Sequence, residues 1–293
     1  MFRPDMFRPR RICAAIYLAA TFAGVCAAQE LRVPDSPVAG IDSTISTTGS
    51  GKATFYLTGP GVSLKTDVTL GEDVHLASQD LRNAGDYLAI LCSGTCRSTH
   101  FYVSAAKSAV LTFLVHPSRV PVAQNDAISG VAFPFDQYRN LVLTSVNVTF
   151  QMTAKDSSLF SRVERTQNGV AWFRTASGKS AGPLQVVASL EDLTARRAVQ
   201  QVASDACNLR ITGQRTKTGI LLQTEAVHDC AGNTLPDGTI VTFTANGLHG
   251  KDTVDAPIKQ GVARAQMDST GASVVSAASG VVTGNEIRVE AQQ

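Results

Sequence analysis

The stretch AVHDCAGNTLPDGTIVTF, Ala226 to Phe243, decides the fold class because its skeleton occurs twice in the chain. Asp229 is followed four residues later by Asn233, and Val-Thr-Phe begins eight residues after that. The same spacing occurs in AFPFDQYRNLVLTSVNVTF, where Asp136 and Asn140 take these two places. Self-similarity at a fixed period predicts duplicated structural units.

Further matches extend the repeat along the second half of the chain. QNGVAW at 167–172 corresponds to KQGVAR at 259–264, and VVAS at 186–189 corresponds to SAAS at 276–279. Each unit is long enough to form a β-sandwich by itself. The strands predicted for the last unit are short runs rich in Val, Thr, Ile and Phe, separated by turn residues: ILLQTEAV, TIVTFTAN, GVARAQM, SVVSAAS and EIRVEA.

The repeated skeleton has turn chemistry, which predicts a loop at a corner between two strands. Gly232 and Asn233 tolerate a positive φ. Pro236 sets the next bend, and Asp237 with Gly238 is a turn pair. The second copy has Leu-Val-Leu after its asparagine, which predicts a loop of different shape there.

The first unit lacks this skeleton but contains LRNAGDYLA at 81–89. This stretch resembles the tyrosine corner of immunoglobulin folds, in which a tyrosine follows a bend and its hydroxyl bonds to nearby backbone. Tyr87 takes that place, with Asn83 where aspartate is usual and Ala89 where immunoglobulins have a core cysteine. The resemblance implies a sandwich without the inter-sheet disulfide.

The segment SLEDLTARRAVQQVAS at 189–204 has two interpretations. Its apolar residues at 190, 193, 199 and 202 fit one face of a helix. Its place in the repeat favours strand, turn, strand instead, and we predict the strands.

In the last unit the motifs D-x-x-G-N, L-P-D-G-T and V-T-F occur together, and in this combination the chain resembles bacterial Ig-like domains of the invasin and intimin type. The resemblance covers most of residues 205–293, is weaker over 108–204, and applies to 31–104 only as a general sandwich. We therefore predict an all-β chain of three tandem immunoglobulin-like β-sandwich domains with these bounds. The resemblance implies a structural or adhesive module outside the cytoplasm, and it identifies no ligand.

Residues 1–28 have the pattern of a secretory signal peptide. Three arginines at 8–11 precede the apolar run Ile12 to Val25, and small residues follow, which predicts cleavage after Ala28. A membrane anchor is the alternative, but the run holds 14 residues and a spanning helix needs about 20. The residues before Cys26 depart from a bacterial lipobox, which argues against a lipoprotein.

Four cysteines remain after cleavage, and their spacing favours one of three pairings. Cys92 and Cys96 frame the tip of a predicted hairpin, while Cys207 and Cys230 lie in neighbouring strands of the last unit. An oxidising compartment favours two disulfides. The alternative is a zinc site, since Cys92, Cys96 and His100 form C-x3-C-x3-H.

No catalytic or cofactor motif is present, so we predict neither an enzyme nor a cofactor. The sequence contains no G-x-S-x-G and no H-E-x-x-H, its GSGK at 49–52 is an incomplete phosphate loop, and its other histidines stand singly at 75, 116, 228 and 249. Calcium is the remaining metal alternative, because Asp229, Asn233 and Asp237 supply hard oxygens in one loop. Asp and Asn in turns more often bond to their own backbone.

Trp172 and Phe173 are adjacent in a predicted strand, so one enters the core and the other faces out. We predict that Trp172 is the core residue, since a lone tryptophan is seldom left exposed. An exposed aromatic would instead stack on a sugar or a protein partner.

The mature chain holds 22 Lys and Arg against 23 Asp and Glu, which gives no electrostatic basis for binding nucleic acid or anionic lipid. The sequence therefore predicts a non-catalytic Ig-like protein of the periplasm, cell surface or extracellular medium that binds a protein or glycan in adhesion. The alternative is a structural or accessory subunit of an envelope or exported complex, with edge strands that pair with a partner. An enzyme is the third possibility.

Overall fold

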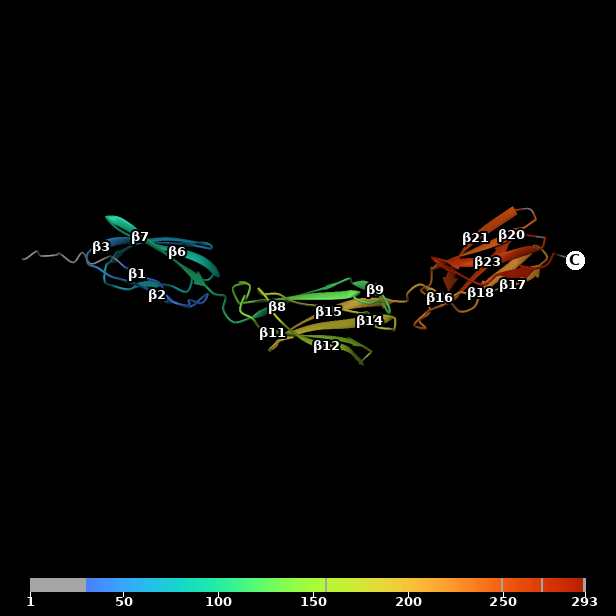
Figure 1. Ribbon diagram of the computed structural model, residues 1–293, viewed down its shortest axis with the longest axis horizontal. Coiled ribbons are helices and arrows are strands. Elements are labelled where there is room, and N and C mark those ends of the chain that lie inside the picture. Colours follow the sequence, from blue (N-terminus) through green and yellow to red (C-terminus); the bar gives the residue numbers. More distant parts are fainter. Residues whose placement is uncertain (1–29, 156, 249, 270, 292–293) are drawn as a thin grey trace, which may run out of the picture.

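The computed structural model describes residues 30–155, 157–248, 250–269 and 271–291, and every regular element in these ranges is a β-strand. Within them the strands form three groups, each around its own hydrophobic core, and the groups lie in a row along the long axis of the molecule (Figure 1). The chain is all-β with tandem Ig-like domains, as predicted. The predicted signal peptide, residues 1–28, lies outside the described residues.

The first domain packs a three-stranded sheet of order β1-β2-β5 against a four-stranded sheet of order β4-β3-β6-β7. Apolar residues alternate with polar ones along β3, so that Ala53, Phe55 and Leu57 are buried in the core between the sheets. Its strands are β1 (Leu31–Arg32), β2 (Ser43–Thr47), β3 (Lys52–Gly59), β4 (Val62–Thr69), β5 (Val74–Leu76), β6 (Gly85–Ser93) and β7 (Thr95–Val103).

The second domain packs the sheet β13-β10-β8 against the sheet β12-β11-β14-β15-β9. Phe150 lies at the centre of its core, with ring centroids of Phe113 and Phe173 at 5.8 and 4.8 Å. All ladders are antiparallel except that of β9 with β15. Its strands are β8 (Val110–His116), β9 (Arg119–Pro121), β10 (Ile128–Phe135), β11 (Asn147–Ala154), β12 (Ser157–Arg165), β13 (Ala171–Thr175), β14 (Gly182–Leu190) and β15 (Leu193–Val202).

The third domain repeats this plan, with β17-β18-β22 on one side and β21-β20-β23 on the other. Both β24 and β25 pair with β23, and a short ladder joins β16 to β19. Its strands are β16 (Ala206–Asn208), β17 (Ile211–Thr216), β18 (Gly219–Thr224), β19 (His228–Asp229), β20 (Ile240–Gly247), β21 (Gly250–Lys259), β22 (Val262–Met267), β23 (Ser273–Ser279), β24 (Val282–Thr283) and β25 (Ile287–Val289).

The segment at 189–204 forms two strands, as its place in the repeat predicted. β14 ends at Leu190 and β15 begins at Leu193, and these two residues face each other across a tight turn in which Glu191 has a φ of 49°. The helical interpretation is wrong because residues 193–201 pair with residues 182–190 in a continuous antiparallel ladder, which uses the backbone groups that a helix would bond internally.

Strand β21 has no counterpart among the predicted strands. Most of its first half is exposed and polar, and only Ala256 and Ile258 near its end are buried. The apolar alternation that announces a strand is therefore missing over most of its length. The strand pairs with β20 throughout and with β22 at its end, so it connects the two sheets.

The prediction that Trp172 is a core residue is wrong. In β13 Phe173 is 1% exposed and packs on Phe150, whereas Trp172 is 65% exposed. Adjacent residues of a strand point to opposite faces, and the pairing of β13 with β10 assigns the inner face to Phe173.

Candidate functional site

The repeated Asp and Asn lie where one domain meets the next. Asp136 is fully buried, and its Oδ1 accepts hydrogen bonds from the backbone N–H of Tyr138 at 2.9 Å and of Asn140 at 2.8 Å. Its Oδ2 accepts from the Asn140 side-chain amide at 2.8 Å and from the N–H of Ala106 at 3.0 Å. Ala106 belongs to the linker that leaves the first domain, so this carboxylate ties the linker to the second domain.

Asp229 makes the same set of contacts at the next junction. Its Oδ1 accepts from the N–H of Ala231 at 2.9 Å and of Asn233 at 2.8 Å, and its Oδ2 accepts from the N–H of linker residue Ser204 at 3.0 Å. Burial would by itself raise the pKa of the Asp229 carboxyl, but hydrogen bonds from Asn233, Ser204 and Ala231 outweigh it and hold the pKa below its usual range. The ionised carboxylate is thus the form that the junction requires.

Each asparagine reaches across to the preceding domain. The Asn140 side chain accepts from the N–H of Ala84 at 2.9 Å and donates to the carbonyl of Arg82 at 2.8 Å. The Asn233 side chain accepts from the N–H of Ala181 and donates to the carbonyl of Lys179, both at 2.8 Å. We refer to residues 82–84 and 179–181 as the first and second sockets. A joint is a socket together with its Asp, Asn and linker amide.

Both sockets are held by a buried polar side chain of their own domain. The hydroxyl of Tyr87, in the predicted tyrosine corner, donates to the carbonyl of Asn83 at 2.8 Å, and burial raises the pKa of this tyrosine. In the second domain the Gln201 amide donates to the carbonyl of Ser180 at 3.0 Å, and its Oε1 accepts from the N–H of Gly178. The middle carbonyl of each socket is therefore bonded from within.

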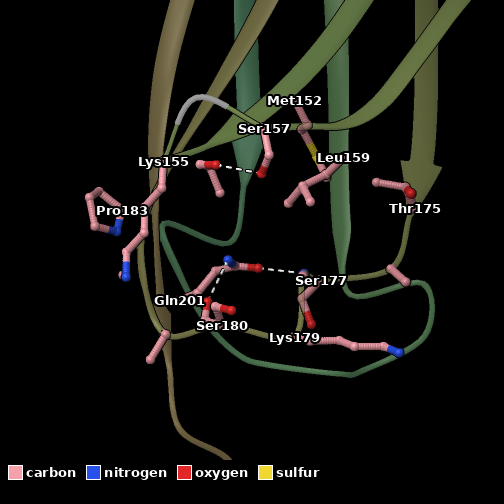
Figure 2. Close-up of a pocket in the computed structure, with 15 residues that line it drawn as sticks. Met152, Lys155, Ser157, Leu159, Thr175, Ser177, Lys179, Ser180, Pro183 and Gln201 are labelled. Carbon is pink, nitrogen blue, oxygen red and sulfur yellow. Dashed lines mark hydrogen bonds between the residues drawn. The ribbon is translucent and has the colours of Figure 1, made fainter. Parts of the chain in front are cut away.

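Figure 2 shows Gln201 beside a pocket of this domain, a cavity of about 420 Å³ at the end of the sandwich. Met152 and Leu159 supply its apolar wall, and the second socket supplies part of its polar wall. The 1% exposure of Gln201 shows that this side chain is structural support for the socket loop.

The sockets were not found by sequence reasoning, although a signal exists. The first reads Arg-Asn-Ala-Gly from Arg82 and the second reads Lys-Ser-Ala-Gly from Lys179. A four-residue pattern of this kind occurs by chance in many chains. Only the hydrogen bonds that these residues make to the following domain identify them as part of a junction. The loop before β23 is the equivalent of the socket loop in the third domain. There the carbonyls of Ser269 and Gly271 accept hydrogen bonds from the guanidinium of Arg215, in the same domain.

Between the Asp and the Asn, the two copies of the loop have the same shape. Arg139 has a φ of 67° and Gly232, at the equivalent place, a φ of 84°. Just beyond the Asn the backbone still corresponds, since Val142 N–H donates to the carbonyl of Pro134 at 3.0 Å and Leu235 N–H to that of Val227 at 3.1 Å. The predicted difference in shape comes after these residues, where the turn from Pro236 to Thr239 and the positive φ of Gly238 have no counterpart at 143–146. The contacts of the Asp and the Asn therefore determine the backbone conformation of the first part of the loop, whichever residues lie between them.

The remaining predicted turn residues of this loop contact the start of β20 and the turn between β21 and β22. The carbonyl of Pro236 accepts from the N–H and hydroxyl of Thr239, and Asp237 accepts from the N–H of Gln260 at 2.7 Å. Gly238 has a φ of 92°, as its turn position requires, whereas Asn233 keeps an ordinary φ.

An aromatic contact distinguishes the two joints. Tyr138 lies between the Asp and Asn of the first joint, packs against the core of the first domain and lies 5.3 Å from the Arg82 guanidinium. A Cβ on Gly40 would lie 2.1 Å from this tyrosine, so glycine leaves room for the ring. At the second joint Ala231 takes the corresponding place. The first joint therefore has an aromatic contact that the second lacks.

The structure forms both disulfides. Cys92 and Cys96 face each other at the end of the β6–β7 hairpin, and Cys207 of β16 is bonded to Cys230 directly after β19. Both thiols of the C-x3-C-x3-H motif are thus consumed. The Asp229 carboxylate, considered for calcium, is surrounded by N–H donors, and within the described ranges no three His, Cys, Asp or Glu side chains gather into a metal cluster.

No known family model and no curated protein sequence matches the chain. Solved structures do match it. The Escherichia coli adhesin FdeC superposes with a TM-score of 0.64 at 15% identity over 90% of this chain and 97% of that one. The fold is that of bacterial Ig-like adhesins.

Two further structures agree with this assignment. Yersinia pseudotuberculosis InvD superposes with a TM-score of 0.53 at 11% identity, over 90% of this chain and 98% of that one. Invasin, a bacterial integrin-binding protein, superposes with a TM-score of 0.51 at 12% identity, over 90% of this chain and 59% of its own. These neighbours are adhesin-type Ig-like proteins and not enzymes. Among the described residues no helix is long and apolar enough to cross a membrane.

Proposed function

We propose that this protein is an exported, non-catalytic Ig-like module that works in adhesion, by holding a binding surface at a defined distance and angle from its point of attachment. The observation that carries the proposal is the duplicated joint. Two buried carboxylates and two bridging asparagines make the same contacts at both junctions. A chain of domains needs such contacts when their alignment matters and does not need them when the domains act separately.

Three further features support this function. The fold is shared with bacterial adhesins. Two disulfides fit an oxidising compartment, in keeping with the predicted signal peptide. The carboxylates buried at the joints are bonded to backbone amides, which suits them for structure and leaves them no free oxygen for catalysis.

Adhesion is tested with the full mature chain, residues 29–293, coated on fluorescent beads. Coated beads are expected to bind to a cell monolayer, to immobilised matrix proteins or to a glycan array more strongly than beads coated with a serum albumin control. Soluble mature chain in excess should compete the binding. Beads that bind none of these surfaces above the control would overturn the adhesive function.

Export is tested by the intact mass of the protein recovered outside the cytoplasm. The expected mass lacks residues 1–28 and the four hydrogens that two disulfides remove. A full-length mass, or four alkylatable thiols, would contradict export through an oxidising compartment.

An accessory role in an envelope complex is the second candidate, because β12 ends its sheet with an unpaired edge. Leu159 and Val163 on this strand are 45% and 60% exposed, and an edge of this kind accepts a strand from another protein. Photocrosslinkers placed on β12 would then give a defined adduct in intact cells, while coated beads would bind no foreign surface.

A further inference from the structure

The outer face of the sheet β13-β10-β8 in the second domain carries an unusual apolar row. Trp172, the only tryptophan of the chain, faces Val131, which faces Leu114 on the next strand. Trp172 is 65% and Leu114 54% exposed. Cross-strand neighbours of this kind lie about 5 Å apart, so the three side chains form one continuous surface.

More apolar residues lie on the same face of β8 and β10. Val110 faces Phe135 across the ladder, and Phe133 lies between Phe135 and Val131 on the outer side of β10. Val110 is 48% exposed and both phenylalanines are partly exposed, while Phe113, Ile128 and Ala132 on the inner side of these strands are buried in the core. The outer row is thus additional to the core and not part of it.

The third domain shows that the fold does not need an apolar row at this place. By the QNGVAW and KQGVAR correspondence, Arg264 replaces Trp172. Arg264 faces Gln223, and Gln223 faces Thr212, in the same order across β22, β18 and β17. All three are exposed and polar. The second domain therefore exposes apolar side chains at three positions where the third domain has polar ones.

The charge of this face is positive. The row beside Trp172 consists of Arg174, Ser129 and His116, which face one another across the three strands. None of these strands contains an aspartate or a glutamate. The complementary surface is therefore apolar at its centre, with carboxylates on the side that meets Arg174.

We propose that the outer face of β8, β10 and β13 is a docking site for a protein with an apolar patch bordered by carboxylates. Trp and Arg are among the side chains most enriched at the energetic centres of protein interfaces. The aliphatic neighbours Leu114 and Val131 offer the hydroxyl groups of a sugar no hydrogen-bond partner, which favours a protein. The proposal rests on the adhesive function proposed above and names the surface and the class of partner.

The test uses a phage-displayed library of 12-residue peptides, panned on the full mature chain. The counter-selection uses a variant with the third-domain row, Leu114→Thr, Val131→Gln and Trp172→Arg. Selected peptides are expected to combine large apolar residues with Asp or Glu. Each is then synthesised, and its binding is measured by the emission of Trp172, which reports only this face because the chain has no other tryptophan.

Acidic peptides are expected to shift the Trp172 emission to shorter wavelength and to bind the triple variant about 30-fold more weakly, measured by biolayer interferometry. Arg174→Glu, a single change on an exposed side chain, is expected to weaken the same peptides about tenfold, and salt should weaken them in the wild type. The variant at Arg174 keeps the test valid if the triple variant unfolds.

Other outcomes overturn the proposal. These are peptides that bind the triple variant equally well, selected peptides rich in Lys and Arg, glycans that replace peptides as the Trp172-dependent ligand, or a dimer in sedimentation that the triple variant abolishes. If beads coated with the triple variant adhere as wild-type beads do, this face is not the docking site, while the adhesive function stands. If wild-type beads adhere to nothing, the adhesive function fails first.

Discussion

Asp136 and Asp229 are the residues on which the junctions depend most. Each buries a carboxylate and saturates it with N–H donors from the loop, the asparagine and the linker. A buried charge that is fully hydrogen-bonded is stable only while its donors stay in place. The carboxylate therefore couples the loop to the linker, and the neighbouring residue types can vary, as Arg139 and Gly232 do.

We predict that Asp229→Asn lowers the unfolding free energy of the third domain by about 2 kcal/mol, because the hydrogen bonds of a buried, charged carboxylate to backbone amides are lost. The measurement is urea unfolding of the mature chain. Asp237→Asn is the matched control in the same loop, since Asp237 is exposed and accepts one backbone bond, from Gln260. Equal losses from the two changes would contradict the role of Asp229.

The same aspartate predicts a pH dependence. Because the pKa of Asp229 is lower in the folded chain, its contribution is present above the unfolded value of about 3.9 and is lost as pH falls through the folded value. The third domain should therefore lose stability below about pH 4, and Asp229→Asn should flatten that loss. The measurement is the urea midpoint between pH 5 and pH 3. A wild type and variant with parallel pH profiles would contradict it.

At the scale of elements, the disulfides clamp different lengths of chain. The Cys207–Cys230 bridge joins two strands 23 residues apart in sequence, and the Cys92–Cys96 bridge closes a hairpin tip over a separation of 4. The first bridge encloses β17 and β18 of the third domain, whereas the second restrains only a turn.

We predict that replacing both Cys207 and Cys230 by serine costs about 3.5 kcal/mol, and replacing both Cys92 and Cys96 about 2 kcal/mol, from the loop entropy of the unfolded chain. Calorimetry of the two double variants checks the order. A larger loss from the hairpin pair would show that its bridge supports more than the tip.

For the whole molecule, the alignment of the domains depends on a few polar contacts and one ring. Tyr138 packs on the first domain, and Ala231 replaces it at the second joint. The second joint thus relies more completely on its asparagine.

We predict that Asn233→Ala loosens the second joint more than Asn140→Ala loosens the first. Residual dipolar couplings measure this, because the alignment tensors of two domains agree when their joint is rigid and diverge when it is mobile. Adding Tyr138→Ala to Asn140→Ala should make the first joint as mobile as the second joint of Asn233→Ala. Asn246→Ala, at an exposed position of β20, is the control that should change neither tensor. Alignment tensors that stay unchanged in Asn233→Ala would show that this asparagine does not hold the second joint rigid.

The sequence by itself determined the strand content, the tandem Ig-like architecture and the disulfide pairing, because alternation, turn residues and cysteine spacing are local properties. It also marked the Asp and Asn of the repeat as special. It did not predict β21, because the first half of this strand is polar and exposed and shows no apolar alternation. It also did not predict the orientation of Trp172, which depends on how β13 packs and pairs with β10.

Only the tertiary structure showed that the repeated Asp and Asn join neighbouring domains. Their partners at Ala84 and Ala181 lie 56 and 52 residues before the asparagines, and no local pattern connects them. The outer row of Trp172 likewise exists only once three strands lie side by side. Both features depend on contacts between distant segments, and such contacts are decided by packing and not by local sequence.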